Sequence, residues 1–229
     1  MKKFISLIAI VGLFNSCQQD IQTNTPAFQA RLNNEHWRAN DAKVSIDGEG
    51  GMTITAYTAY ETIVLKSNAS NVGTYILGTQ DYFANHASYA NDVQNFQDLY
   101  TTEPVEGPAF KLSEMITNGT GYINSQGAQT IGGSGVGLRV ATQTAGGVVT
   151  SVTVVARGNG YKAGDIITIV GGENDATFSI VNVQSSNGEI IIEKIENGLY
   201  TGKFKFNAVN ASGEVVTFSE GWFYKLPLE

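Results

Sequence analysis

The 229-residue sequence contains a single cysteine, Cys17, so no disulfide bond can form within the chain. Its two histidines, His36 and His86, lie far apart in the sequence, which argues against zinc because a zinc site needs several His or Cys ligands. Asp165 and Asp175 stand in glycine-rich turns without a D-x-D-x-D run, so we expect them to cap turns and not to bind calcium. We therefore expect no metal.

Catalytic motifs are also missing. The chain has no Gly-x-Ser-x-Gly elbow, so no pattern in it places a nucleophilic serine beside a base. The stretch GGSGVG at 132–137 lacks the Gly-Lys-Ser/Thr ending of a phosphate loop, and turns explain its glycines better. The carboxylate pairs Glu193/Glu196 and Glu103/Glu106 are typical of solvated strand ends and linkers. We expect no cofactor and no enzymatic activity.

Basic residues are few. Without Lys2 and Lys3, which fall within residues 1–16, the chain has 12 basic and 21 acidic residues, a net charge of −9. Binding of nucleic acid depends on neutralising phosphates with Lys and Arg, so this balance excludes nucleic acid as an expected partner. It argues equally against electrostatic attraction to anionic lipid.

The amino-terminal stretch MKKFISLIAIVGLF is positively charged and then apolar, but it is too short to span a membrane. With the following NSC it resembles the lipobox of bacterial lipoproteins. This resemblance implies a signal peptide at 1–16, lipidation of Cys17 and a polar tether at 17–26. We therefore expect a protein of the cell envelope, an outer-membrane lipoprotein held by its lipid. Asp20 resembles a surface-export signal and leaves exposure at the cell surface open.

Long segments with helical periodicity are absent. Short runs of alternating apolar residues, separated by Gly, Asn and Asp, predict an all-β fold. Residues 188–226 have the pattern of a four-stranded meander, in which EVVTFSE and GWFYKL are separate strands. Strands within 27–101 would cover its apolar face, which predicts an antiparallel β-barrel or β-sandwich.

An internal repeat lies in the glycine-rich middle of the chain. GTGY recurs as GNGY, and the Gly-Gly at 132–133 recurs at 171–172, both at an offset of 39 residues. The repeat predicts one β unit used twice. Tyr122 and Tyr161 follow the two Gly-x-Gly turns, so we expect them to be packing residues with their hydroxyls at the rim.

The composition shifts predict the domain boundaries. Two of the four prolines fall within TTEPVEGP at 101–108, just before the glycine-rich segment. We expect an inserted Gly-rich β-repeat domain at 109–186, called the insert. It would be carried by a discontinuous host β domain at 27–108 and 187–229, called the host.

Four motifs carry a family resemblance in the host. FQARLNNEHWRA, GTYILG, GKFKFNA and GWF resemble a family of uncharacterised Bacteroidota lipoproteins. The resemblance implies a calycin-like or sandwich β fold and no established activity.

A second resemblance concerns the insert. GNGYKAGDIITIVGG, followed by ATFSIVNV, resembles Gly-rich β modules of phage tail and bacterial surface proteins. It implies a structural or adhesive role.

Residues 81–100 combine five aromatic side chains with Asn, Asp and Gln. Such a mixture suits sugar stacking or the lining of a cleft, but it also suits strands that turn their aromatics into the core. Tyr82 and Tyr89 are the ligand-binding candidates. The sequence thus predicts a lipid-anchored, non-catalytic binding or accessory protein, with a glycan, a small molecule or a protein open as its partner. The alternative is an adhesive surface protein whose insert makes the contacts.

Overall fold

The computed structural model describes residues 27–93 and 96–229, except for the side chains between positions 93 and 97. The described chain forms two antiparallel sheets. The expected all-β fold is confirmed, because every regular element in the described residues is a strand. The predicted signal peptide, Cys17 and the tether lie outside these residues. Among the described residues, no helix is long and apolar enough to cross a membrane.

The first sheet has eleven strands drawn from both ends of the described chain. They are β1 (Ala27–Leu32), β2 (Glu35–Arg38), β3 (Asp41–Ile46), β4 (Met52–Tyr57), β5 (Glu61–Ser67), β6 (Gly73–Leu77), β7 (His86–Val93), β8 (Phe96–Thr101), β15 (Asn187–Glu196), β16 (Leu199–Val209) and β17 (Val215–Pro227). Their order is β2-β1-β17-β16-β8-β7-β5-β4-β3, and β15 pairs with β16 and with β6.

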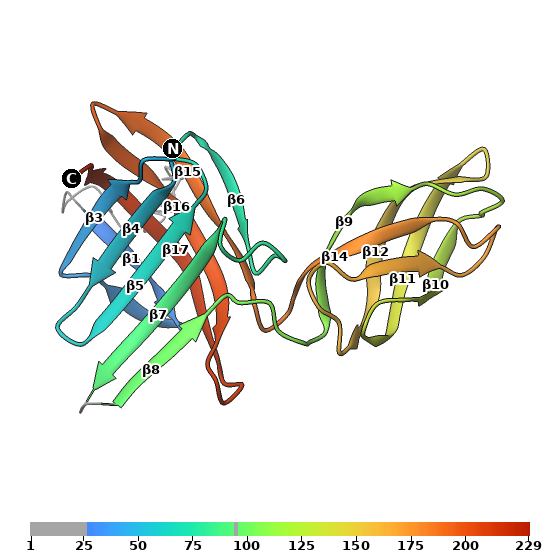
Figure 1. The fold of residues 1–229 in the computed structure, drawn as a ribbon, viewed down its shortest axis with the longest axis horizontal. Coiled ribbons are helices and arrows are strands. Elements are labelled where there is room, and N and C mark those ends of the chain that lie inside the picture. Colours follow the sequence, from blue (N-terminus) through green and yellow to red (C-terminus); the bar gives the residue numbers. More distant parts are fainter. Residues whose placement is uncertain (1–26, 94–95) are drawn as a thin grey trace, which may run out of the picture.

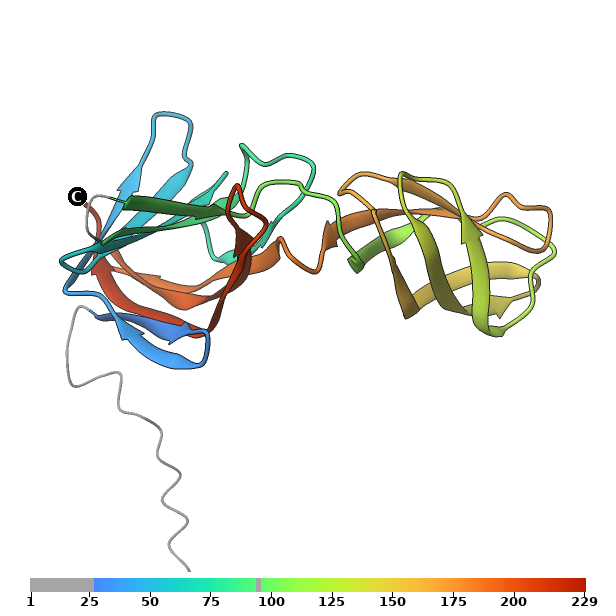
Figure 2. The ribbon, with the colours of Figure 1, turned by 90° about the horizontal axis from the view of Figure 1, so that it is seen from below.

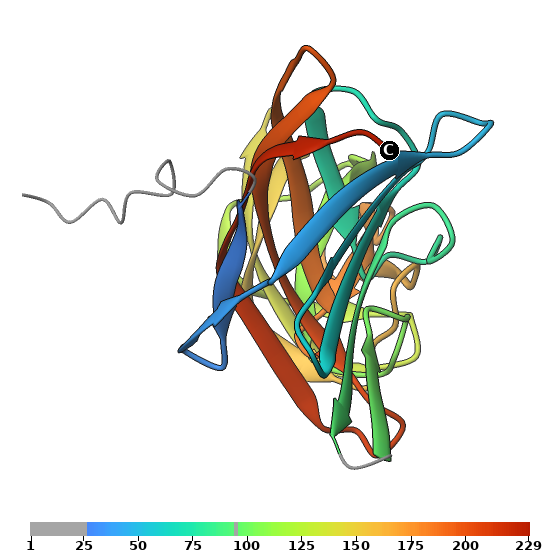
Figure 3. The same ribbon diagram turned by 90° about the vertical axis from the view of Figure 1, so that its left-hand side faces the viewer.

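This sheet folds into two layers that face each other across one core. The layer of β6, β15, β16, β17, β1 and β2 meets the layer of β8, β7, β5, β4 and β3 at a single register pair, Val209 with Thr101. On the opposite side, Val44 forms a parallel bridge with Leu228. Figure 3 views the sheet end-on, with the two layers on either side of the core. The result is a barrel-like sheet, because both outer strands of the second layer, β8 and β3, reach the first layer.

Stacked aromatic rings fill the space between the layers. Phe204 stacks on Phe28 at 4.7 Å between ring centroids, and Phe206 stacks on Phe218 at the same separation. Alternation explains this packing, since Phe204 and Phe206 are buried while Lys203 and Lys205 on the same strand face water. Offset aromatic pairs of this kind add stability beyond the apolar area that they bury.

The predicted four-stranded meander has three strands. EVVTFSE and GWFYKL belong to one strand, β17, so their prediction as separate strands is wrong. A β-bulge at Glu220, with φ of 50°, carries the strand past the point where the turn was expected. The glycine that follows it, Gly221, continues to pair with Phe204.

The second sheet has six strands and forms the nearly closed barrel on the right of Figure 1. Its strands are β9 (Ala109–Thr117), β10 (Ser125–Ile131), β11 (Val136–Ala145), β12 (Val148–Asn159), β13 (Ile166–Ile169) and β14 (Thr177–Val183), in the order β12-β11-β10-β13-β14-β9. Side chains close the gap between β12 and β9. Arg157 Nη1 donates to the carbonyl of Ala109 at 2.8 Å, and Asn118 Nδ2 donates to that of Val149 at 2.7 Å.

The two copies of the repeat pack onto each other. Tyr122, in the first copy, lies against Gly171 and Gly172 of the second, while Tyr161 in the second copy lies against Gly135 of the first. Both tyrosines are buried, 5% and 2% exposed. The expected placement of their hydroxyls at the rim is wrong. The Tyr122 hydroxyl donates to Ile169 O at 3.0 Å and accepts from the backbone N–H groups of residues 175 and 176.

The two sheets lie along the long axis of the molecule and are joined by short connections (Figures 1 and 2). Their buried cores share no residue. Val105 packs against the second core, and polar contacts also cross the junction. Asn182 Nδ2 donates to Leu77 O at 3.0 Å, and Lys162 pairs with Glu106 at 3.0 Å. The backbones of Gly107 and Tyr161 bond to each other in both directions.

Candidate functional site

The structure separates the two tyrosines that the sequence singled out. Tyr89 is 3% exposed and packs in the first core against Phe218. Its hydroxyl donates a hydrogen bond of 2.6 Å to Glu61 Oε1. Burial, followed by this hydrogen bond, raises the pKa of the Tyr89 hydroxyl. A side chain so enclosed presents no surface to a ligand.

Tyr82 lies in the turn before β7 and is partly exposed. Its ring stacks on His86, with centroids 4.8 Å apart, beside Phe83, which is 83% exposed. Burial and then nearby Glu103 raise the pKa of the Tyr82 hydroxyl. Burial and then Lys66 lower the pKa of His86. Tyr82 therefore remains a surface candidate.

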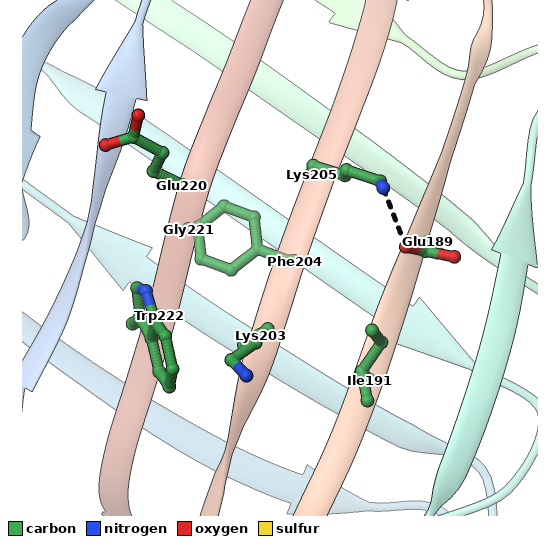
Figure 4. Close-up of a pocket in the computed structure, with 8 residues that line it drawn as sticks. All are labelled: Glu189, Ile191, Lys203, Phe204, Lys205, Glu220, Gly221 and Trp222. Atoms are coloured by element: carbon green, nitrogen blue, oxygen red, sulfur yellow. Dashed lines mark ion pairs between the residues drawn. The ribbon is translucent and has the colours of Figure 1, made fainter.

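A groove with a volume of about 350 Å³ lies on the outer face of β15, β16 and β17. Two rows of side chains, one on each side of the groove, cross these three strands (Figure 4). The charged row is Glu189, Lys205 and Glu220, and the mixed row is Ile191, Lys203 and Trp222. Phe204 and Gly221 lie between the rows.

The bulge in β17 creates this arrangement. Successive residues of a regular strand point to opposite faces, so Phe218, Glu220 and Trp222 would share one face of an unbroken strand. Phe204 pairs with Gly221, and Phe206 pairs with Phe218, so Ser219 and Glu220 together oppose one residue, Lys205. The extra residue lets Phe218 stay in the core while Glu220 and Trp222 both line the outer groove.

Ion pairs position the charged side chains of the groove. Lys205 Nζ lies 2.9 Å from Glu189 Oε1, and Glu220 is held at 2.8 Å by Arg31 from β1. Most of these side chains remain accessible: that of Lys205 is 64% exposed and that of Glu220 is 70% exposed. Such solvated pairs add little to stability. Their donors and acceptors therefore stay available to a ligand.

Lys203 is held more firmly than its neighbours. Its ammonium lies 2.6 Å from Glu193 Oε1 and 4.3 Å from the ring centroid of Trp222. A cation over the indole face is attracted by the ring's electrons. These two contacts fix the indole at the end of the groove, where it forms an apolar wall.

The described residues do not assemble a metal cluster. No group of three or more His, Cys, Asp or Glu side chains within them could hold a metal ion. Asp165 caps a turn, as expected, accepting from Lys162 N at 2.9 Å and from the backbone and hydroxyl of Ser134. Burial raises the pKa of Asp165, but these hydrogen bonds outweigh it and lower the pKa below its usual value. Asp175 similarly accepts from the backbone N–H of Thr120 at 3.0 Å.

Sequence reasoning missed the groove. The alternation of KFKF, which turns Lys203 and Lys205 away from the two buried phenylalanines, was the available signal. The bulge that turns Glu220 and Trp222 to the outer face left no signal of its own, because GWF was assigned to a new strand.

Searches among curated proteins and among solved structures found no match. A family model described as "Domain of unknown function (DUF6252)" matches residues 24–134 and 138–227. The matched ranges include strands of both sheets and all the residues that line the groove. Since they cover well over half of the sequence, the chain belongs to this DUF6252 family.

Proposed function

We propose that the protein is a lipid-anchored, non-catalytic binding protein of the cell envelope and that the groove on β15–β17 holds its ligand. The groove is the observation that carries the proposal. Ligand sites are concave, with volumes from about 300 Å³ upward, and combine apolar walls with a few fixed polar groups. The groove has such a volume, an indole wall and four charged side chains.

The make-up of the groove supports binding over catalysis. Its lining includes no Ser, Cys or His. A reaction centre needs a nucleophile or base oriented by a partner. The two carboxylates of the lining, Glu189 and Glu220, each pair with a cation, at 2.9 and 2.8 Å, and neither has a Ser, Cys or His beside it in the lining.

The proposal of a lipid anchor at Cys17 rests on the sequence. Cys17 follows an apolar run of signal-peptide length, and the host motifs resemble those of Bacteroidota lipoproteins. One acyl chain binds a membrane weakly, whereas several chains hold a protein stably. We place the protein in the outer membrane and leave the leaflet to the experiment.

Metabolic labelling tests the anchor. The full-length chain is produced in a bacterium that processes lipoproteins, in the presence of an alkyne fatty acid. The wild type should be labelled and found with membranes, and Cys17→Ser should be unlabelled. Ser16→Ala is the matched control and should be labelled normally, since it keeps a small residue before the cysteine. Equal labelling of the wild type and Cys17→Ser would refute the anchor, and protease treatment of intact cells would identify the leaflet.

A second candidate function is adhesion through the insert, favoured by an apolar patch on β10 and β13. Ile131 pairs with Thr168, whose neighbours two residues away on the same face are Ile166 and Val170. The three apolar side chains are 57%, 52% and 40% exposed, respectively. Clustered exposed apolar residues mark interaction surfaces more often than scattered ones do.

Substitution of the patch separates the two functions. Ile131→Asp should abolish attachment of cells to a partner surface if the insert is adhesive, and leave it unchanged if the groove carries the function. Val155→Asp is the control, because Val155 is 53% exposed on β12 of the same barrel.

A further inference from the structure

We infer that the ligand of the groove is an uncharged saccharide chain lying across β15, β16 and β17. This inference rests on the proposed function, because it names the class of ligand for the same site. It is argued from the charges along the groove, from the pairing of its strands and from its dimensions.

The charges that line the groove cancel and alternate. Glu189 and Glu220 lie on either side of Lys205, and Lys203 supplies the second positive charge. A ligand of either sign would meet as much repulsion as attraction. A sugar hydroxyl both donates and accepts, so a row that alternates acceptor, donor and acceptor can bond successive hydroxyls.

The apolar lining fits the carbon-bound face of a sugar ring. Trp222 and Ile191 stand at opposite ends of the mixed row, with the stem of Lys203 between them. Aromatic and aliphatic surfaces of this kind bury C–H groups, while the charged row is left for the hydroxyls.

Strand pairing argues against an extended peptide in the groove. A peptide that binds a sheet usually adds a strand at a free edge through its main chain. Each strand beneath the groove already has two neighbours: β15 lies between β6 and β16, β16 pairs with β15 and β17, and β17 lies between β16 and β1. The groove therefore offers only side chains to its ligand.

The width of the site indicates a chain and not a single sugar. Neighbouring strands are about 4.8 Å apart, so side chains on three strands span about 10 Å. One strand spacing is close to the length of one hexose unit. The groove also crosses an outer sheet face, so a longer chain can continue past both ends.

Isothermal titration calorimetry tests the inference on the processed lipoprotein, purified in an amine-oxide detergent that carries no sugar. The probes are cellohexaose, laminarihexaose, mannohexaose and maltohexaose, with hexagalacturonate as the anionic comparison. At least one neutral hexaose should bind, and its affinity should change little between about 0.05 and 0.5 M salt because the ligand has no charge to screen. Failure of all four neutral probes would overturn the inference.

Variants locate the binding. Trp222→Ala should weaken binding by about tenfold or more, as expected for the loss of the aromatic wall of a binding site. Tyr224→Ala is the matched control, since Tyr224 lies two residues further along β17 and does not line the groove. Lys205→Met and Glu220→Gln, at largely exposed side chains, should weaken binding without changing the melting temperature.

The outcomes distinguish this inference from the proposed function. Binding of hexagalacturonate alone, lost in Trp222→Ala, would overturn the neutral saccharide and leave the groove as the binding site. A neutral hexaose that binds equally well to all groove variants would overturn the groove itself.

Discussion

The hydroxyl of Tyr89 donates a 2.6 Å hydrogen bond to Oε1 of Glu61, and this bond joins neighbouring strands β7 and β5. The other carboxylate oxygen, Oε2, accepts a 2.9 Å bond from Nε1 of Trp37 on β2. Because β2 belongs to the opposite layer, Glu61 ties the two layers of the first sheet together. The residue chosen as a ligand candidate from sequence is thus part of the network that holds the barrel closed.

Removing this hydroxyl should weaken the first sheet. A hydrogen bond to a charged group contributes about 1.5–3 kcal/mol, so Tyr89→Phe should lower the free energy of unfolding by about that amount. Tyr57→Phe is the control, because the Tyr57 hydroxyl bonds Asp41 at 2.9 Å on the exposed surface and should cost less. Urea unfolding followed by tryptophan fluorescence measures both. Equal losses for the two variants would contradict the role given to Glu61.

Acidification should destabilise the region around His86. Burial and Lys66 lower the pKa of His86 from its ordinary value of 6.5, so the folded state favours the neutral ring. Stability from this preference is present above pH 6.5 and is lost as the pH falls below it. His86→Phe, which can still stack on Tyr82, should lose less stability than the wild type between about pH 7 and pH 5.

His36 supplies the control for this prediction, since it is exposed on β2. Melting temperatures of His36→Phe should follow those of the wild type across the same pH range. If His86→Phe also followed the wild type, the titration of His86 would have no part in acid stability.

Removal of the insert should leave a folded host. The chain enters and leaves the second sheet at neighbouring points, because Gln184 N donates to Pro108 O at 2.9 Å and Ala109 pairs with Val183. A short Gly-Ser bridge in place of residues 109–186 should therefore span the gap. Circular dichroism should show a cooperative β-type unfolding transition, because the two cores share no residue. A product without that transition would show that the host needs the insert.

Sequence patterns predicted the fold class because burial in a sheet alternates along each strand. The patterns could not predict which aromatic faces a cavity. Tyr89 and Tyr82 come from the same aromatic-rich segment, yet one lies in the core and the other in a turn. A shift of register by one residue exchanges the two faces of a strand, so the face depends on pairing partners far away in sequence. The groove depends on pairing between distant strands in two ways. The register of β16 sets which of its side chains face outward, and the bulge at Glu220 does the same for β17.

The repeat could likewise be found from sequence, but its mode of packing could not. Equal spacing shows that two copies exist and leaves open whether each tyrosine packs within its own copy. In the structure, the turn that carries Gly135 in the first copy receives the ring of Tyr161 from the second. Asp165 holds this turn, since its Oδ2 accepts from Ser134 N at 3.0 Å and from Ser134 Oγ at 2.7 Å.

The contact between Gly135 and Tyr161 gives a steric prediction for the insert. A Cβ at Gly135 would lie 2.5 Å from Cγ of Tyr161 and 2.6 Å from the backbone oxygen of Asn159. Neither group can move freely, because the tyrosine ring is buried and the oxygen belongs to the backbone. Gly135→Ala should therefore destabilise the insert by about 1–3 kcal/mol, the usual cost of overpacking.

Gly127→Ala is the matched control for this substitution. A Cβ at Gly127 would meet nothing within 4 Å. The Gly127→Ala substitution should leave the free energy of unfolding unchanged or raise it by up to about 1 kcal/mol, because alanine restricts the unfolded chain. Hydrogen exchange of the backbone amides, followed by mass spectrometry, resolves the two sheets in the intact protein. Faster exchange in β10–β14 of Gly135→Ala, with unchanged exchange in β15–β17, would support interlocked repeats in a separately unfolding insert. Normal exchange throughout Gly135→Ala would mean that the turn yields and that the interlock contributes little to stability.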